Sequence, residues 1–334
     1  MIDPPPLVRA LLDAVEDPSL LVERERTVAA NAAALGLFGA AVVGRDVRLA
    51  IRQPQALSAI QTGQPAELEV SGIGGVERSW GLAVRPVGEG LLLVRLSDRS
   101  ALRAAEKTRV DFVANASHEL RTPLATIIGY AETLADEGEL PDPLRQRFAG
   151  AIHGEARRML RIVGDLMSLS RIESERFTVP SERVDLREVA LTAVVNARPL
   201  ADERGAIVTV GEDDSRPAVT GDYAQLLQLA DNLVANAIRY GCPTRGRSVG
   251  VEVLRQGREA LLRVTDHGEG IPSEHIPRLT ERFYRIDAAR SRDTGGTGLG
   301  LAIVKHIVER HRGRLQIESE LGRGTVVTVG LPLA

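Results

Sequence analysis

The sequence contains a single cysteine, Cys242, among its 334 residues. One cysteine excludes an internal disulfide and a cluster of cysteine metal ligands, and it fits a reducing compartment. Histidine is absent before His118. Residues 1–100 therefore offer neither a histidine ligand for haem nor a cysteine for a flavin adduct, which limits the cofactors that this segment can hold.

Long hydrophobic runs are also missing. No run reaches the roughly 18 to 20 apolar residues that a membrane-spanning helix needs, and the N-terminus does not resemble a secretory signal. The nearest run, 29–44, is shorter, contains Asn31 and is interrupted by glycines. We interpret it as a core segment and expect a cytoplasmic protein without a membrane span, with peripheral association with a membrane left open.

Basic charge is not in excess, since 42 Lys and Arg residues face 45 Asp and Glu residues and the net charge is -3. Neither this balance nor any local block predicts nucleic acid as a partner. The contents of 43% hydrophobic and 26% charged residues are typical of a soluble globular protein. The length exceeds that of one ordinary core, so two or three domains are expected.

Residues 1–97 are predicted to form a small α+β domain. A short apolar strand at 19–22 precedes a turn and an alanine-rich helical segment, and strand-like runs follow at 66–70, 80–84 and 91–96. The order of strand, turn, asparagine and short helix in DPSLLVERERTVAANAAALGLFG resembles the start of PAS sensor domains. That resemblance implies a PAS-like sensor domain over 1–97.

Residues 98–179 change to a helical pattern. Apolar residues recur every three or four positions in two stretches, separated by the connection 136–143 with Gly138 and two prolines. Two long amphipathic helices with a short connection predict an antiparallel hairpin. Because two helices cannot close a core around both apolar stripes, we expect a homodimer that forms a four-helix bundle.

Residues 180–334 have an α/β pattern. Helices are predicted at 186–197, 223–240 and 299–312, and strands at 206–210, 249–254, 260–265, 315–319 and 325–331. This order favours a sheet with helices on one face, a two-layer sandwich.

The segment FVANASHELRTPL, 112–124, places His118 beside Glu119 and five residues before Pro123. A proline inside a helix removes a backbone hydrogen bond, here to the carbonyl of Glu119, and costs about 3 kcal/mol, which indicates a wanted bend. An exposed histidine whose Nδ1 proton is accepted by a neighbouring carboxylate leaves Nε2 as a nucleophile. On spacing alone, an exposed histidine beside a tolerated kink is an equal alternative.

Polar side chains recur every four residues in the predicted helix 223–240, at Gln228, Asn232, Asn236 and Tyr240. Two stacked amides can offer carbonyl oxygens to Mg²⁺, which prefers oxygen ligands and shares them with phosphates. Tyr240 can flank a planar base. The alternative is a solvated helix face, for which asparagine is a poor choice on propensity grounds.

The segment DHGEGIP, 266–272, follows a predicted strand. Asp266 can accept a hydrogen bond from an exocyclic amine, and Gly268 and Gly270 allow a ligand close to the backbone. An ordinary turn would have the same composition.

The segment RFYRID, 282–287, leads into a run in which Gly295, Gly296, Gly298 and Gly300 open an apolar-striped helix. Amides at a helix N-terminus favour anions such as phosphate. The run has no Gly-Lys-Ser/Thr and no G-x-G-x-x-G after a strand, so it is neither a P-loop nor a dinucleotide fingerprint. A flexible linker is the alternative.

The ordered set of segments resembles sensor histidine kinases. Residues 118–124 look like the H box, 232–240 like the N box, 266–272 like the G1 box, 282–287 like the F box and 296–300 like the G2 box. The run EKTRVDFVANASHELRTPLATIIGYAETL is similar to the phosphate-regulon group in particular. The resemblance implies a dimerisation and histidine phosphotransfer domain over 98–179, followed by a GHKL (Bergerat) ATP-binding domain over 180–334.

The same resemblance implies ATP and Mg²⁺ as cofactors and the receiver domain of a response regulator as partner. His118 would be the phosphoacceptor, Glu119 its orienting acid or base, and Thr122 would accompany phosphatase activity toward the phosphorylated regulator. Asn236 with Asn232 would hold Mg²⁺, and Asp266 would bind the adenine amine. The implied nucleotide-binding residues are Asn232, Asn236, Arg239, Tyr240, Asp266, Gly268, Gly270, Ile271, Arg282, Phe283, Gly296, Thr297, Gly298, Leu299 and Gly300.

Two positions depart from the family pattern. Arg239 stands where lysine is common, and Gly241 where Thr or Ser is common. We expect neither to abolish ATP binding. Transfer to His118 requires the ATP-binding domain to swing against the hairpin, and we expect the hinge within 168–180.

Two other functions compete. A GHKL ATPase that works as a conformational clamp would carry a glutamate four residues before Asn236 to activate water, whereas this chain has Asn232 there. A scaffold that binds nucleotide without turnover is the second alternative.

Overall fold

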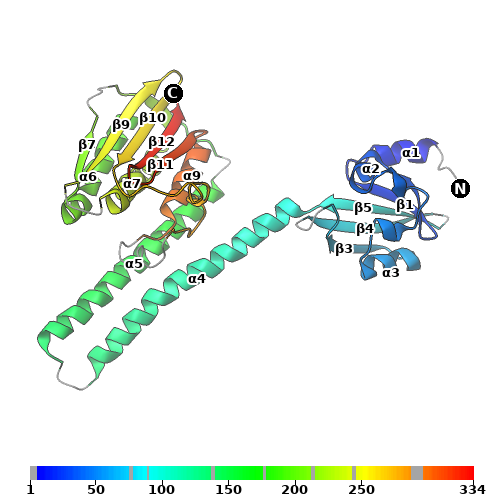
Figure 1. Cartoon of the computed structure of the whole chain (residues 1–334), viewed down its shortest axis with the longest axis horizontal. Helices are drawn as coiled ribbons and strands as arrows, with labels where there is room; N and C mark the ends of the chain where they lie inside the picture. The colour runs from blue at the N-terminus through cyan, green and yellow to red at the C-terminus, as the bar shows by residue number, and fades with distance from the viewer. Residues whose placement is uncertain are drawn as a thin grey trace. The chain divides into compact units, whose positions relative to one another are not determined.

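The structure of the chain is a computed structural model, which describes residues 6–74, 78–88, 90–136, 140–175, 178–211, 215–242, 246–286 and 296–334. Two compact units result, Met1–Val113 and Ala114–Ala334 (Figure 1). Gly138, Asp287 and Gly295, which the sequence motifs include, lie outside the described residues.

The first unit is built on a five-stranded antiparallel sheet in the order β2-β1-β5-β4-β3. Its strands are β1 (Ser19–Glu23), β2 (Arg26–Ala30), β3 (Ala66–Ser71), β4 (Ser79–Gly88) and β5 (Leu91–Asp98). The helices are α1 (Pro6–Asp13), α2 (Ala32–Phe38) and α3 (Pro54–Thr62), with single 3-10 turns at Ala40–Val42 and Val47–Leu49. Side chains from both helices and strands, including Trp80, fill the larger apolar core, and a smaller cluster joins Leu12 of α1 to Leu21 and Ala29 of the sheet.

The predicted strands β1, β3, β4 and β5 are confirmed. Strand β2 differs from the prediction, which expects a turn and a helical segment after the first strand. The alternating burial of Thr27 and Ala29 arises from pairing with β1, which the alanine-rich sequence does not reveal. The helical segment begins only at Ala32, after Asn31.

Asn31 is a buried polar residue that joins β1 to α2. Its Oδ1 accepts hydrogen bonds from the backbone amides of Ser19 and Ala34, at 3.0 and 2.9 Å. Its Nδ2 donates to the carbonyls of Val15 and Asp17, at 2.8 and 2.9 Å. Every hydrogen-bonding group of the amide is thus used, which is the condition for burying it at low cost.

Two long helices follow, α4 (Ser100–Ala135) and α5 (Asp142–Ser174). They pair as the predicted antiparallel hairpin: Tyr130 stacks on Phe148 near the connection, with ring centroids 5.1 Å apart, and Glu119 meets Arg158 farther along. Helix α4 continues through Pro123. Among the described residues, no helix is long and apolar enough to cross a membrane.

The remainder of the second unit is an α/β sandwich (Figure 1). Its main sheet has the order β11-β12-β10-β9-β7, in which β7 runs parallel to β9 and the other pairs are antiparallel. The strands are β7 (Ile207–Val210), β9 (Ser248–Gln256), β10 (Glu259–Asp266), β11 (Arg314–Glu320) and β12 (Gly324–Pro332). The helices are α6 (Leu186–Arg204), α7 (Tyr223–Gly241) and α9 (Gly300–Arg310), with a 3-10 turn at Ile276–Arg278.

These helices and strands match the predicted order within a few residues at their ends. Helix α6 is longer than predicted, since it passes Pro199 and ends at Arg204, where Gly205 with φ 62° forms a left-handed cap. The two-stranded sheet of β6 (Glu182–Asp185) and β8 (Ala218–Gly221) was not predicted, because ERVD and AVTG lack the run of β-branched residues that marks the equally short β7, IVTV.

Candidate functional site

His118 lies exposed on the surface of α4. One turn later, Thr122 donates a hydrogen bond from Oγ1 to the backbone carbonyl of His118, at 3.3 Å. Pro123 has no amide hydrogen to give to the carbonyl of Glu119. The histidine side chain is therefore accessible to an incoming group. The helix just after His118 lacks one of its regular backbone hydrogen bonds.

The carboxylate of Glu119 is engaged by two arginines. Nη2 of Arg158 on α5 lies 2.9 Å from its Oε2, and Nη1 of Arg285 lies 3.9 Å from the same atom. Both arginine side chains are only 9% exposed. Sequence reasoning expected Glu119 to orient His118 and missed both arginines, because in a chain this rich in arginine neither has a distinguishing spacing.

Helix α7 presents the predicted polar and apolar stripes. Asp222 caps its N-terminus by accepting from the amide of Gln225, at 3.1 Å. The apolar stripe, Leu226, Leu229, Leu233 and Ala237, is buried. Asn232 and Asn236 face the first residue of α9: a Cβ added to Gly300 would lie 3.1 Å from Oδ1 of Asn232 and 3.8 Å from Nδ2 of Asn236.

Asp266, at the end of β10, is held by backbone amides. Its Oδ1 accepts from the amides of Gly268 and Thr325, at 2.9 and 3.2 Å. Burial raises the pKa of this carboxyl, and these two hydrogen bonds oppose the rise. A Cβ at Gly241 would lie 2.2 Å from Cβ of Asp266, so only glycine fits at the end of α7.

The loop after Asp266 also requires glycine. Gly270 has φ +73°, and a Cβ there would lie 2.1 Å from the carbonyl oxygen of Glu320. The next amide, that of Ile271, donates to Oγ of Ser319 at 2.8 Å. The loop thus lies against the β11–β12 turn, which brings Ile271 to the same end of the sheet as Asp266.

The remaining two motifs meet each other. The amide of Phe283, a residue with φ 63°, donates to the carbonyl of Gly298 at 2.8 Å, and Gly298 itself has φ +72°. A Cβ at Gly296 would lie 2.5 Å from the hydroxyl of Tyr240. Leu299 is fully buried and anchors the start of α9. Residues from the predicted N, F and G2 boxes are therefore in contact.

Helix α5 supplies carboxylates to this region. Thr297 donates a hydrogen bond from Oγ1 to Oδ2 of Asp165, at 2.7 Å, and Arg282 forms an ion pair with Glu173. Burial raises the pKa of Asp165. Burial, followed by the charge of Arg161, lowers the pKa of Arg239. These contacts were not expected from the sequence, because the family resemblance implied only that Arg282 binds nucleotide.

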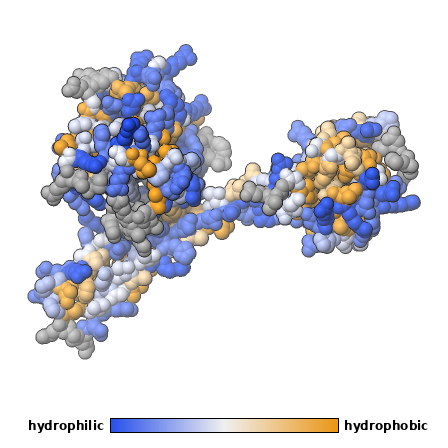
Figure 2. Space-filling view, viewed as in Figure 1, coloured by the Kyte–Doolittle hydropathy of each residue, from blue (hydrophilic) through white to orange (hydrophobic). Residues whose placement is uncertain are grey.

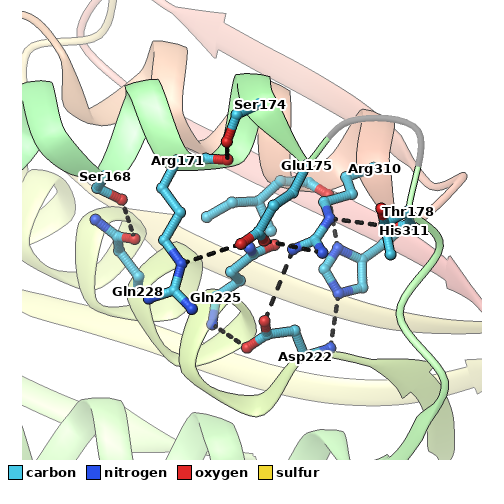
Figure 3. A network of polar contacts seen from close by, with 11 residues as sticks. Ser168, Arg171, Ser174, Glu175, Thr178, Asp222, Gln225, Gln228, Arg310 and His311 are labelled. Atoms are coloured by element: carbon cyan, nitrogen blue, oxygen red, sulfur yellow. Dashed lines mark hydrogen bonds and ion pairs between the residues drawn. The ribbon is translucent and has the colours of Figure 1, made fainter.

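Polar contacts also tie the end of α5 to the far ends of α7 and α9 (Figure 3). Ser168 donates from Oγ to Oε1 of Gln228 at 2.6 Å. Arg310 lies between Glu175 and Asp222, with its Nη2 3.1 Å from Oε2 of Glu175 and its Nη1 3.7 Å from Oδ2 of Asp222. The segment expected to act as a hinge is thus anchored at its α5 end.

The site can be tested for its fit to nucleotide and metal. Asp266 is a half-buried acceptor beside glycines that leave space on the backbone, as a planar amine-bearing base needs. Among the described residues, no group of three or more His, Cys, Asp and Glu could hold a metal ion. Two amides near a helix N-terminus instead fit Mg²⁺ that is bound largely through phosphate oxygens and water.

Comparison with known proteins agrees with this arrangement. Residues 108–175 match the family model "His Kinase A (phospho-acceptor) domain", and residues 221–334 match "Histidine kinase-, DNA gyrase B-, and HSP90-like ATPase". The second model supports ATP binding by this part of the chain.

Curated relatives extend over most of the chain. The sensor-like histidine kinase SenX3 of Mycolicibacterium smegmatis is 36% identical over 302 residues, which are 87% of this chain and 77% of the relative. The phosphate regulon sensor protein PhoR of Pseudomonas aeruginosa is 40% identical over 242 residues, which are 72% of this chain. The match spans 53%, about half, of the PhoR length.

Solved structures share the fold. The Acinetobacter baumannii histidine kinase AdeS has a TM-score of 0.52 at 24% identity, covering 65% of this chain and 98% of that one. Histidine kinase ThkA, solved in complex with response regulator protein TrrA, has a TM-score of 0.50 at 18% identity and covers 97% and 98%. Together with the relatives' sequences, the matched domains show that this chain belongs to the phosphate-regulon-like sensor histidine kinases.

Proposed function

We propose that the chain is a protein-histidine kinase that phosphorylates His118 from ATP and passes the phosphoryl group to an aspartate of a response regulator. Nε2 of His118 would attack the γ-phosphorus, the bond to the bridging oxygen of ADP would break, and the imidazole would lose its proton. The observation that carries the proposal is that an exposed histidine on α4 and a site of the ATP-binding type belong to one compact unit.

The residues assigned to the nucleotide have distinct tasks in this proposal. Asp266 accepts a hydrogen bond from the adenine amine, and Tyr240 and Ile271 flank the ring. Arg239 and Arg282 balance phosphate charge, while the amides that open α9 bind phosphate oxygens. Asn232 and Asn236 would hold Mg²⁺, which supplies charge neutralisation during phosphoryl transfer.

Glu119 is proposed to accept the proton that His118 loses. Its present partners are Arg158 and Arg285, so it must turn from them toward the imidazole when transfer takes place. Arg285 belongs to the ATP-binding region, whereas Glu119 and Arg158 belong to the helical hairpin. A swing of that region relative to the hairpin, with the hinge within 168–180, would loosen this contact while it brings ATP to His118.

The rival function is direct hydrolysis of ATP. A hydrolase needs a base to activate water, and the position one helical turn before Asn236 holds Asn232, an amide that cannot accept a proton. Incubation with γ-labelled ATP separates the two functions. The kinase yields acid-labile label on the protein, a hydrolase yields free phosphate alone, and a scaffold yields neither.

Phosphatase activity toward the phosphorylated regulator is proposed to depend on Thr122. Its hydroxyl lies one turn from His118 on an exposed helix face, where it can orient a water molecule. Thr122→Ala should lose dephosphorylation of the cognate receiver while autophosphorylation persists. Thr126→Ala, one turn farther along α4, is the control, and wild-type dephosphorylation rates in Thr122→Ala would contradict the proposal.

A homodimer is proposed because the hairpin leaves apolar side chains uncovered, some of which Figure 2 shows on the surface of this region. Leu124 and Ile128 on α4 and Leu160, Val163 and Met167 on α5 are exposed. Packing two hairpins into a four-helix bundle would cover them. Light scattering should give a dimer for the chain and a monomer for a Val163→Glu, Met167→Glu variant. A dimeric variant would contradict this arrangement.

We further propose three domains, a PAS-like sensor over 1–97, the phosphotransfer domain over 98–179 and the ATP-binding domain over 180–334. Support for the first comes from the segment that carries the resemblance, which folds as strand, turn, strand and Asn-capped helix. Limited proteolysis of the intact chain should cut first near 98 and 180. A first cut inside any of the three would contradict the division.

A further inference from the structure

Helix α5 packs one face against the ATP-binding region. Ile162, Leu169 and Ile172 are almost fully buried on it, at 0%, 1% and 2% exposure. Asp165 and Glu173 flank this apolar stripe at helical spacing. Their carboxylates are therefore held at the edge of a packed interface, next to the side chains that the proposed function assigns to ATP.

Both carboxylates are bound to such side chains. Asp165 accepts the hydroxyl hydrogen of Thr297, and Glu173 pairs with Arg282. Nε2 of His306 on α9 lies 3.6 Å from the same Glu173 oxygen. Burial lowers the pKa of Arg239, and the negative charge of Asp165 is among the groups that oppose this shift.

Carboxylate and phosphate oxygens make the same demands on an arginine or a hydroxyl donor. A guanidinium that pairs with a carboxylate in a forked geometry pairs with a phosphate in the same way. Arg282 cannot give its full set of donors to a triphosphate while Glu173 holds it. The negative charge of Asp165 and Glu173 also repels the incoming phosphates.

We propose that Asp165 and Glu173 are an internal competitor of the ATP phosphates, so that α5 lowers nucleotide affinity while it is docked and nucleotide binding releases it. The inference rests on the proposed function only in taking Arg282 and Arg239 as phosphate-binding groups and Thr297 as a nucleotide-binding residue. Linkage makes the effect reciprocal: bound ATP lowers the equilibrium constant for docking of α5 by the same factor by which docking lowers the affinity for ATP. Docking through α5 thus regulates the site by charge.

The test is nucleotide binding to the full chain and its Glu173→Gln variant. The glutamine keeps the size of the side chain and removes the charge. Because the pair is partly exposed, removing the competition should lower the Kd for ATP by about threefold to fivefold. Adenosine has no phosphate, so its Kd, measured by NMR titration, should not change.

Glu309→Gln is the matched control. Glu309 lies on α9, near Lys305 and His306, but it does not link α9 to α5. Its removal should leave the Kd for ATP unchanged. Asp165→Asn should act in the same direction as Glu173→Gln, since it removes the second carboxylate.

Three results would overturn the inference. They are an unchanged or higher Kd for ATP in Glu173→Gln, an equal tightening of ATP and adenosine, and an equal effect of Glu309→Gln. The titration involves no phosphoryl transfer. Tighter ATP binding in Glu173→Gln without label on His118 would contradict the kinase proposal and leave the competition standing, whereas a wild-type chain that binds no ATP would contradict both.

Discussion

Arg310 and Glu175 join the end of α9 to the end of α5, with Nη2 of the arginine 3.1 Å from Oε2 of the glutamate. The Arg310 side chain is only 6% exposed. Its Nε donates to the carbonyl of Thr178, at 3.2 Å, beyond the end of the helix. One guanidinium therefore fixes the C-terminus of α5, the connection that follows it and, through Asp222, the start of α7 (Figure 3).

Arg310→Met should destabilise the protein by about 2–4 kcal/mol, because it removes a buried cation that contacts two partly buried carboxylates, those of Glu175 and Asp222. Urea unfolding followed by circular dichroism measures the loss. Arg171→Met is the control, since Arg171 also pairs with Glu175, at 3.2 Å, but is 76% exposed. It should cost less than about 0.5 kcal/mol. Equal losses in the two variants would contradict the role of burial.

His311 should make stability depend on pH. Its Nδ1 donates a hydrogen bond to the carbonyl of Ile307 at 2.8 Å, and its Nε2 accepts one from the amide of Asp222 at 3.0 Å. Burial is the main cause that lowers the pKa of His311, opposed by the Ile307 hydrogen bond; Arg310 lowers the pKa further and Asp222 raises it. The folded state therefore takes up this proton less readily than the unfolded state does.

The stability linked to His311 is present above its unfolded pKa, near 6.5, and is lost as pH falls from there toward the lowered pKa of the folded state. The urea midpoint of the wild type should fall between pH 7.5 and pH 5.5. His311→Gln keeps an acceptor but does not titrate, so its midpoint should fall less. Some dependence should remain, because burial also lowers the pKa of His306. Parallel decreases in both proteins would argue against this assignment.

Gly241→Ser should weaken ATP binding, although serine is common at this position in the family. Its Cβ would lie 2.2 Å from Cβ of Asp266 and displace the residue proposed to bind adenine. Overpacking of this size costs about 1–3 kcal/mol, which corresponds to roughly fivefold to a hundredfold in Kd. Gly250→Ser in β9, where the nearest atom is 4.0 Å away, is the control. Wild-type affinity in Gly241→Ser would show that Asp266 can move without loss.

Asn31→Ala should destabilise the first unit by about 2–4 kcal/mol, since it removes a helix cap and leaves buried backbone groups without partners. Trp80 is the only tryptophan of the chain and is buried in that unit, with its Nε1 donating to the carbonyl of Ile73. Its fluorescence therefore reports unfolding of this unit alone. Gln61→Ala, at an exposed position of α3, should not shift the transition. An unshifted transition in Asn31→Ala would contradict the prediction.

The elements that the sequence predicted are those with a long or strict period. Helices α4, α5 and α7 and the alternating strands β9, β10 and β12 extend far enough for their apolar faces to be read. Strand β2 was not predicted, because its alanine and threonine residues are compatible with either a helix or a strand. Pairing with β1 makes it a strand. Strands β6 and β8, ERVD and AVTG, have four residues each and lack the β-branched run of the equally short β7, IVTV.

The motifs located the residues that meet around Asp266 and Asn232, but not their partners from α5. Motif residues follow one another at spacings that can be recognised, whereas Asp165 and Thr297 are 132 residues apart and meet only after α5 packs on α9. Arg158 and Arg310 look like members of a solvated arginine-rich face in the sequence. These two arginines matter because they are buried, and the segments that bury them are distant in the sequence, so no local pattern predicts the burial.

The central claim is that His118 accepts the γ-phosphoryl group of ATP. Wild type, His118→Gln and His153→Gln are incubated with γ-labelled ATP and Mg²⁺, and protein-bound label is measured after acid and after alkali. His153 is the control because it is an exposed histidine on the partner helix α5. We predict acid-labile, alkali-stable label on wild type and His153→Gln, and none on His118→Gln. Full labelling of His118→Gln, or free phosphate without labelled wild-type protein, would contradict the account.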